Sequence, residues 1–302
     1  MPELPEVEAI AVFLADRTVG ARVARVDLAS IAALKTVAPP LSSLEGRVVT
    51  AVRRRGKFLV LETNDDNADI DGGSSVSLVV HFARAGWLQW RDDVPTGPVR
   101  PGKGPLALRA QFVTPDGELC GGFDITEAGT RKGLALWVVT DAMEVPRLAT
   151  LGPEPLDESF TTESLAEILA AAGRHQVKGV LRDQSLIAGI GNAYSDEVLH
   201  VARLSPFAPC SSLTPDSIAL LHQAIGSTLR DAIGRSVGQR PALLKSEKRA
   251  GMRVHGRTGE ACPECGDVVR EVSFAESSLQ YCATCQTGGR PLADRRLSKL
   301  IK

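Results

Sequence analysis

Four cysteines near the end of the chain have the spacing of a metal site. They follow the pattern CxxC-x16-CxxC and are Cys262, Cys265, Cys282 and Cys285. Zinc prefers four tetrahedral ligands, and two such pairs can close a four-thiolate site with no open position. The alternative is two disulfides, which would fit a reducing compartment poorly. The spacing therefore predicts one structural Zn2+ per chain, in a ribbon hairpin with strands at 268–274 and 279–281.

A proline after the initiator methionine is a second group that could do chemistry. Removal of Met1 would expose the secondary amine of Pro2, and an α-amino group has a pKa of about 8, so a useful fraction is neutral near pH 7. Such an amine can attack the anomeric carbon of a sugar and form an iminium, as lysine forms a Schiff base. The neighbouring Glu3 could supply a proton as a general acid. Taken alone, the same residues also fit a plain lead-in to a helix.

Two further segments have the composition of phosphate contacts. Gly189 and Gly191 lie between two expected short helices, where backbone amides can approach another molecule, and Asn192 could add a side-chain donor. The run RRRGK, which ends at Lys57, places three arginines and a lysine in a tight turn. Each segment also has a structural alternative, namely a plain connection between helices and a solvated hairpin tip.

Apolar periodicity predicts the elements that position these residues. A helix is expected over 5–19, because Pro5 suits its first turn and apolar residues recur on one face. Short apolar segments separated by turn residues then predict an antiparallel sandwich or barrel. These segments are 23–29, 48–53, 57–62, 76–82, 87–90, 106–114, 118–124 and 134–140. Polar or Pro/Gly-rich loops are expected at 63–75 and 92–105, and helices at 162–172, 177–182, 196–201 and 215–235.

The expected fold class is therefore α+β. An N-terminal antiparallel β-sandwich with a helix at its start precedes a helical region and a C-terminal zinc-ribbon hairpin. The expected domains are 1–145 for the sandwich, 146–160 for a linker, 161–250 for the helical domain and 251–302 for the zinc finger.

Charge and hydropathy narrow the class of protein further. The 302 residues carry a net charge of −1, with 43% hydrophobic residues, which is ordinary for a soluble folded chain. Residues 203–302 nevertheless hold 15 of the 35 Lys and Arg against 9 of the 36 Asp and Glu. Positive charge thus gathers around the expected finger, as in a nucleic-acid-binding surface, although chance could produce the same excess. The sequence contains no run of eighteen apolar residues, so it predicts no membrane span. The acidic start is also unlike a secretory signal, so a cytoplasmic location is expected.

Six segments together resemble the formamidopyrimidine-DNA glycosylase/endonuclease VIII family. They are MPELPEVE at the start, RGKFLV at 55–60, LGPEPL at 151–156, AGIGNAYSDEVL at 188–199, VHGRTGEACPECG at 254–266 and YCATCQ at 281–286. The resemblance runs the full length of the chain. It implies a β-sandwich domain and a helix-two-turn-helix domain with a zinc finger, and DNA bound between them.

The resemblance also implies an activity. The chain would be a base-excision repair DNA glycosylase with AP (apurinic/apyrimidinic) lyase activity, acting as a monomer on damaged double-stranded DNA of the nucleoid. Pro2 would attack the anomeric carbon, Glu3 would assist opening of the sugar ring, and Glu6 would support the active site. Lys57 and Asn192 would hold phosphates near the lesion. The damaged base would have to leave the base stack, which costs a few kcal/mol.

The sequence departs from the family pattern where the family contacts the damaged base pair. HFARAG at 81–86 replaces the usual HLGMSG, so His81 matches while Arg84 stands in place of a methionine. TRKG at 130–133 replaces the usual RRFG, so Arg131 matches while Lys132 replaces an aromatic wedge. His81, Arg84 and Arg131 are therefore candidate DNA contacts of altered character.

The finger departs from the family pattern as well. Ser277 occupies the position of an arginine that grips the phosphate around the lesion in the family, and Arg270 on the opposite strand is a candidate substitute. The family's lesion-capping segment is not recognisable in 236–251.

Several functions therefore stay open. The chain could be an active glycosylase for formamidopyrimidine-type oxidised purines, which the MPELPEVE start favours, or for oxidised pyrimidines or another lesion. It could also be a weak or inactive protein that binds lesions or abasic sites, or a zinc-ribbon protein acting on RNA.

Overall fold

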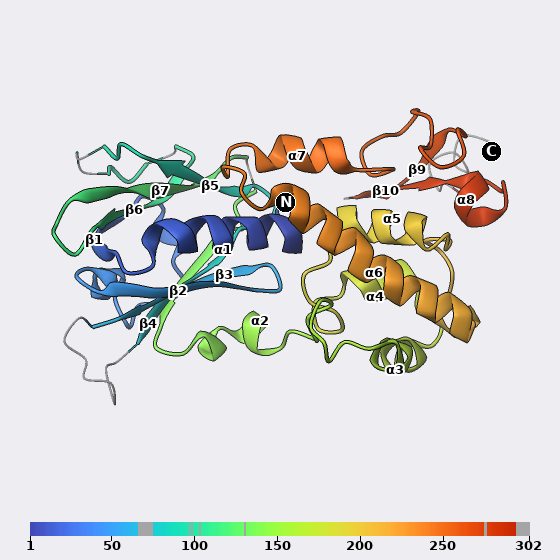
Figure 1. Ribbon diagram of the computed structural model, residues 1–302, viewed down its shortest axis with the longest axis horizontal. Coiled ribbons are helices and arrows are strands. Elements are labelled where there is room, and N and C mark those ends of the chain that lie inside the picture. Colours follow the sequence, from blue (N-terminus) through green and yellow to red (C-terminus); the bar gives the residue numbers. More distant parts are fainter. Residues whose placement is uncertain are drawn as a thin grey trace. The chain divides into compact units, whose positions relative to one another are not determined.

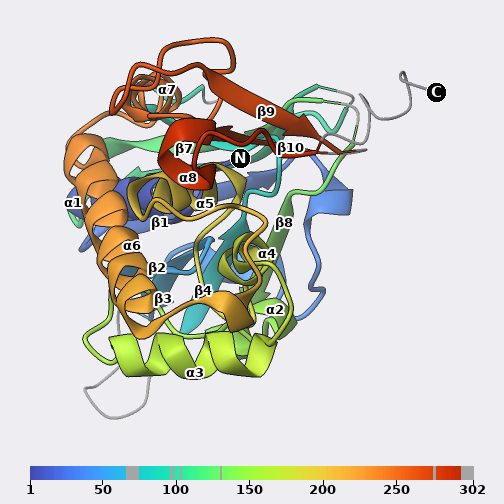
Figure 2. The ribbon, with the colours of Figure 1, turned by 90° about the vertical axis from the view of Figure 1, so that its right-hand side faces the viewer.

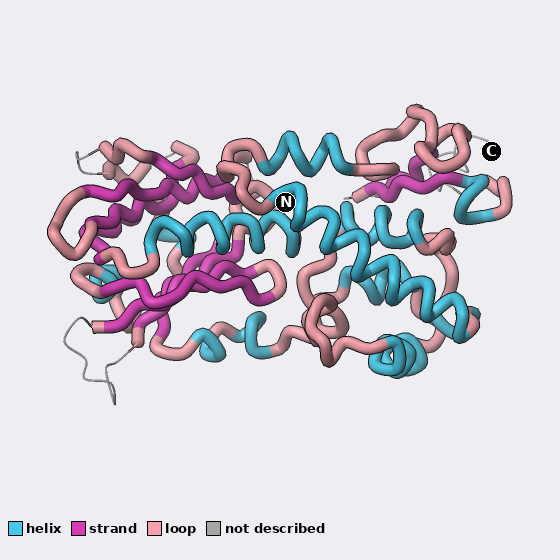
Figure 3. Tube along the Cα trace, viewed as in Figure 1, coloured by secondary structure: helices cyan, strands magenta, loops and turns pink. Residues whose placement is uncertain are grey.

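An eight-stranded antiparallel sheet and the helix before it form the first part of the chain (Figures 1 and 3). The computed structural model describes residues 1–65, 75–95, 97, 99–102, 104–129, 131–274 and 277–293. The sheet order is β5-β7-β6-β1-β2-β3-β4-β8. The strands are β1 (Arg22–Leu28), β2 (Val48–Arg55), β3 (Phe58–Asn64), β4 (Val76–His81), β5 (Gly86–Arg91), β6 (Leu106–Val113), β7 (Leu119–Glu127) and β8 (Ala135–Val139). All eight confirm the expected segments, with small shifts at their ends.

The sheet is nearly divided between β1 and β2, and its two parts form the two layers of the predicted sandwich. β1 and β2 pair only through Arg22 and Val48, whereas the other neighbours pair along most of their length. Helix α1 (Leu4–Thr18) lies between the β5-β7-β6-β1 half and the β2-β3-β4 strands in Figure 1. Its buried face packs into one apolar core with side chains from both halves, such as Leu59 and Phe123. Each large apolar side chain buried in this way stabilises the fold by roughly 1.5–3 kcal/mol.

The second part of the chain is helical and ends in a two-stranded hairpin (Figure 2). Its elements are α3 (Thr162–Ala172), α4 (Val177–Arg182), α5 (Asn192–Val201), α6 (Pro215–Ser236), α7 (Leu244–Gly251), β9 (Val269–Ser273), β10 (Ser278–Cys282) and α8 (Ala283–Thr287). Helix α5 packs against β10 and α8. A short helix α2 (Pro146–Ala149) precedes this part, and single 3-10 turns lie at Ile31–Ala33, Leu41–Leu44, Ala142–Glu144 and Cys210–Ser212.

These elements gather into two compact units. One unit comprises Met1–Thr150 and Arg235–Lys245, and the other comprises Leu151–Gly234 and Ser246–Lys302. The three domains and the linker expected from the sequence stay a prediction. Among the described residues, no helix has both the length and the apolar character needed to cross a membrane.

Four helices differ from the sequence prediction. Helix α5 begins at Asn192 instead of 196, because the glycine-rich loop ends in an extended Gly191 at the N-cap. Helices α2, α7 and α8 were not expected. Helix α7 is almost entirely polar, and its buried Leu244 joins the core of the sheet unit, so no apolar stripe announces it. Most of the expected loop at 63–75 and part of the loop at 92–105 lie outside the described residues.

Candidate active site and zinc centre

The start of α1 holds Pro2 and two carboxylates in a buried cluster. Pro2 is buried directly before the helix, Glu3 is 2% exposed and Glu6 is fully buried. The Glu3 amide donates to Glu6 Oε2 at 2.8 Å, and the Glu3 side chain accepts from the Glu6 amide in return. This reciprocal capping box satisfies two of the free amides at the helix start, where negative charge is also stabilised by the helix dipole. The candidate nucleophile is therefore attached to a rigid element.

The RRRGK run forms the turn between β2 and β3, and the structure separates the roles of its residues. Gly56 has φ +56° at this turn, a conformation that favours glycine. Arg54 donates to Glu8 Oε2 at 2.6 Å and to the Gly56 carbonyl at 3.3 Å, and the Arg54 side chain is only 9% exposed. The ion pair binds the turn to the first part of α1. Lys57 is buried beside it, at 7% exposure.

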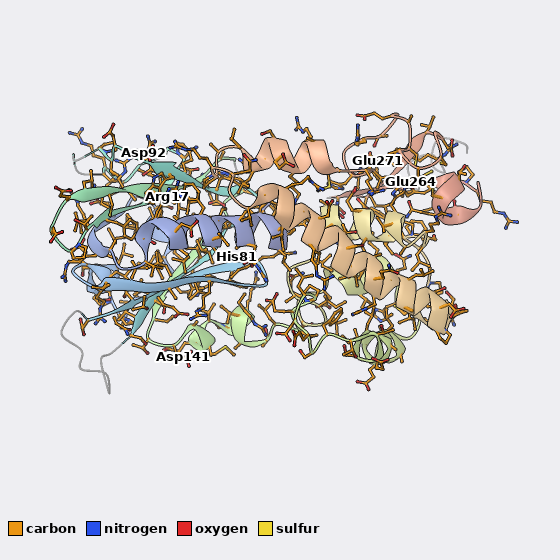
Figure 4. All side chains as sticks on the ribbon, viewed as in Figure 1. Arg17, His81, Asp92, Asp141, Glu264 and Glu271 are labelled. Atoms are coloured by element: carbon orange, nitrogen blue, oxygen red, sulfur yellow. The ribbon has the colours of Figure 1, made fainter. Side chains whose placement is uncertain are left out.

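His81 adds a neutral donor to the same region. It is the last residue of β4 (labelled in Figure 4), lies opposite Phe58 in the β3 register and packs its ring 4.8 Å from the Phe58 ring. Burial, together with the positive charges of Lys57 and Arg147, lowers the pKa of His81 from 6.5 to about 4. The imidazole is therefore neutral near pH 7, so Lys57 supplies positive charge here and His81 supplies hydrogen bonding.

The loop between β4 and β5 presents Arg84 on the surface. The Gly86 amide donates to the Phe82 carbonyl at 2.8 Å, and a Cβ at Gly86 would lie 2.2 Å from that carbonyl oxygen. Only glycine fits so close a turn, and Ala83 within it has φ +50°. Arg84 is exposed in this tight loop. The loop is thus built to hold its arginine outward.

The loop after β7 is organised by Glu127. This carboxylate is 5% exposed and accepts from the Gly133 amide at 2.6 Å and the Leu134 amide at 2.8 Å. Lys132 donates from Nζ to the Glu127 carbonyl at 2.5 Å. Lys132 therefore closes its own loop in this structure, while its neighbour Arg131 is exposed.

The two arginine-bearing loops lie against each other. A Cβ built on Gly133 would be 3.2 Å from Ala83 Cβ, and one built on Gly129 would be 3.8 Å from Ala85 Cβ. The structure therefore brings the loops of Arg84 and Arg131 together from distant parts of the sequence.

Asn192 begins α5 and is tied to the hairpin. Its side-chain amide donates to the Ser278 carbonyl at 2.8 Å. Its Oδ1 is buried and has no hydrogen-bond partner within the described part of the chain. The loop before Asn192 is braced by Gln184, which donates to the Ile190 carbonyl at 2.7 Å and accepts from the Gly189 amide at 3.0 Å. The expected phosphate-binding loop is thus an ordered structure.

Sequence reasoning missed a buried polar network around α5. Lys178, which is 5% exposed, donates to Asp196 at 2.6 Å and to the Ser195 hydroxyl at 2.8 Å. The other Asp196 oxygen lies 2.7 Å from His255 Nδ1. Adjacent Glu197 accepts from the amides of residues 253–255 at 2.6, 3.0 and 2.8 Å. Asp196 and Glu197 lie inside AGIGNAYSDEVL. Two consecutive acidic residues in this largely apolar segment were the sequence signal that could have predicted the network.

The four cysteines converge as the spacing predicts. Their sulfur atoms all lie within 4.8 Å of one another, with Cys262–Cys285 at 3.8 Å and Cys265–Cys282 at 3.4 Å. A tetrahedral zinc ion with Zn–S bonds of about 2.3 Å separates its sulfurs by about 3.8 Å. The donor set and its spacing therefore fit one structural zinc ion, held by Cys262, Cys265, Cys282 and Cys285.

The hairpin separates Arg270 from Ser277. Arg270 is exposed and pairs with Tyr281, next to the cysteine end, whereas the Ser277 carbonyl accepts from the Phe274 amide at 2.7 Å near the tip. Arg270 remains a predicted DNA contact, made from the cysteine end of the hairpin rather than from the position of Ser277.

Comparison with known proteins agrees with this architecture. Residues 1–125 match the formamidopyrimidine-DNA glycosylase N-terminal domain, 151–240 match its H2TH domain, and 259–288 match the zinc finger found in FPG and IleRS. A formamidopyrimidine-DNA glycosylase of Symbiobacterium thermophilum is 35% identical over 95% of this chain and 89% of its own. The chain belongs to the formamidopyrimidine-DNA glycosylase family. The helical part is therefore the H2TH domain, and the hairpin is the zinc finger of this family of DNA repair proteins.

Two more members help to place this chain in the family. An uncharacterized formamidopyrimidine-DNA glycosylase-like protein of Mycobacterium tuberculosis is 59% identical, over 52% of this chain and 98% of its own. The structure of Lactococcus lactis Fpg (MutM) with DNA containing N7-benzyl-Fapy-dG has a TM-score of 0.77 at 27% identity, covering 95% of this chain and all of that one. The shared fold thus extends over nearly the whole molecule.

Proposed function

We propose that this protein excises damaged bases from duplex DNA and then cleaves the strand as an AP lyase. The observation that carries the proposal is the buried cluster of Pro2, Glu3 and Glu6 at the start of α1, in a chain of a DNA glycosylase family. We further propose that it acts as a monomer in the cytoplasm, at the nucleoid.

The chemistry begins once Met1 has been removed. The neutral Pro2 amine attacks C1′ of the damaged nucleotide, a C–N bond forms, the glycosidic bond to the base breaks, and the proton of the amine passes to the departing base. Glu3 donates a proton to O4′ as the sugar ring opens, which leaves an iminium at C1′. The Glu3 carboxylate left by this step takes a 2′ proton as the 3′ phosphate departs, and hydrolysis of the iminium by water releases Pro2. The positive end of α1 disfavours the ammonium form of the amine.

Phosphate contacts would hold the strand during these steps. Lys57 supplies a charge and neutral His81 a hydrogen bond on the sheet unit. Asn192 and the amides at the start of α5 supply donors on the H2TH domain. Arg84 and Arg131, on adjoining loops, are the candidates for contacts with the bases around the lesion.

Formamidopyrimidine-type purines are the substrates that we favour. The family of the chain and the Fapy-dG ligand of the L. lactis relative support this choice. Two charged side chains in place of apolar wedges favour oxidised pyrimidines or another lesion as the alternative. A second candidate function, binding of lesions or abasic sites without catalysis, is favoured by Ser277 at the usual finger-arginine position.

Borohydride trapping tests the proposal. The purified protein, shown by mass to lack Met1, is incubated with duplex DNA carrying one abasic site, and borohydride is added. We expect a covalent adduct that Pro2→Gly abolishes. Base release from a panel of oxidised bases should fall at least tenfold in Glu3→Gln, while exposed Glu158→Gln behaves like the parent. Tight binding without an adduct would leave a damage-binding protein instead of an enzyme.

A further inference from the structure

A buried histidine of the H2TH domain reaches a zinc ligand. His200 lies in the last turn of α5, is 1% exposed, and has its Nε2 3.2 Å from Cys262 Sγ. We propose that His200 is a positioning residue of the zinc centre, whose N–H donates to the Cys262 thiolate and links the metal to α5. This inference does not depend on the proposed DNA chemistry.

The surroundings of the ring determine which nitrogen carries the proton. A thiolate bound to zinc can only accept a hydrogen bond, so His200 Nε2 must be the protonated nitrogen. Nδ1 is then an acceptor, and it is buried with no partner within the described part of the chain. A half-satisfied imidazole that is buried from solvent costs free energy. Its contact with the sulfur is the compensating interaction that the geometry shows.

The charge of the zinc centre gives that contact its value. Four thiolates and one Zn2+ carry a net charge of −2, and donors to the sulfurs spread this charge. Cys262 is only 3% exposed, so a side-chain donor does what solvent does at an exposed sulfur such as that of Cys265. At low dielectric such a bond is stronger than in water.

The position of His200 also links zinc to the start of α5. Asn192 at the first residue of α5 bonds the Ser278 carbonyl on β10, and Asp196 in the middle accepts from the Gln280 amide on the same strand. His200 adds a contact to a metal ligand near the other end. Helix α5 is therefore held against the zinc finger along its length, and the ion helps to hold Asn192 in place.

Zinc release from the full-length, zinc-loaded protein tests this role. A chromogenic chelator records the release rate for the parent, His200→Phe and His200→Gln. We expect release to be faster by about tenfold or more in His200→Phe, because the loss of partners outside the ligand set usually weakens metal sites by 10–100-fold. His200→Gln keeps an N–H donor and should recover part of the loss. Exposed His175→Phe is the matched control. Equal release rates for the parent and a folded His200→Phe would refute the proposal.

A second measurement needs no variant. Nitrogen NMR of the histidine-labelled, zinc-loaded parent assigns the ring proton of His200. We expect the Nε2–H tautomer, with a slowly exchanging proton, and, after cadmium replaces zinc, a scalar coupling between this proton and the metal through the sulfur. An Nδ1–H tautomer would overturn the proposal even if every variant misfolded.

Discussion

At the scale of single residues, burial divides similar side chains into different roles. Arg54 belongs to the run RRRGK, which the sequence analysis interpreted as one basic segment. The fold sets it apart from that segment, because it pairs with Glu8, 46 residues away, and the pair fixes the turn that carries Lys57. Lys132 likewise bonds the carbonyl of Glu127, while its neighbour Arg131 lies on the surface. A substitution of Arg54 or Lys132 therefore tests structure, whereas a substitution of Lys57 or Arg131 tests binding.

His81 should make folding stability depend on pH. Its pKa is lowered from 6.5 to about 4, so the folded protein prefers the neutral ring. Between these values the unfolded chain binds a proton that the folded chain does not. The stability contributed by neutral His81 is thus fully present above pH 6.5 and falls as the pH drops towards 4. We expect His81→Asn to have a shallower dependence of unfolding free energy on pH in this window, measured by urea unfolding. Parallel curves for parent and variant would contradict the assignment, and exposed His175→Asn serves as control.

At the scale of elements, α5 combines two requirements in one helix. Its start must present amides and Asn192, and its body must bind the segment that leads into the zinc finger. Buried acids meet the second requirement, since Asp196 and Glu197 accept from backbone amides and from His255. Polar groups buried in this way are costly unless every donor is satisfied, so such a helix tolerates few changes.

Glu197→Gln should destabilise this attachment. A neutral amide accepts fewer hydrogen bonds than a carboxylate and turns its own N–H2 towards the amides of residues 253–255. We expect a loss of about 1–3 kcal/mol in unfolding free energy, the usual cost of leaving buried donors unpaired. Chemical denaturation of Glu197→Gln beside the exposed control Glu158→Gln measures it. A change no larger than that of the control would show that the three bonds contribute little.

At the scale of the whole molecule, the net charge is small, but positive charge is concentrated in one part of the sequence. The chain is nearly neutral, but residues 203–302 carry an excess of six positive charges. Outside these residues, the start of α5 adds backbone amides, and the sheet unit adds Lys57. A nearly neutral protein of this kind can bind DNA through local positive regions, while its remaining surface stays acidic.

DNA binding should therefore depend strongly on salt. Binding to a duplex with an abasic analogue, followed by fluorescence anisotropy, should weaken linearly in a plot of log affinity against log salt. Lys57→Ala should reduce the slope of that plot by about one, which is the signature of one lost phosphate contact. Exposed Lys35→Ala is the matched control. An unchanged slope for Lys57→Ala would exclude a phosphate contact for this lysine.

The sequence by itself determined the strands, most helices and the zinc ligands. These features depend on local patterns, since a strand shows period two and a CxxC knuckle brings two ligands together over four residues. The polar helix α7 was not predicted, because its single buried residue gives no periodic apolar pattern.

Only the tertiary structure decided which distant residues meet. Arg54 reaches Glu8, the loop of Arg84 lies on that of Arg131, and His200 meets Cys262 across 62 residues. The charge and the periodicity of the sequence do not predict such pairs, because each partner taken alone resembles an ordinary surface or core residue. Burial after folding removes water from these groups, and the partner that replaces water then sets whether a side chain is structural, binding or catalytic.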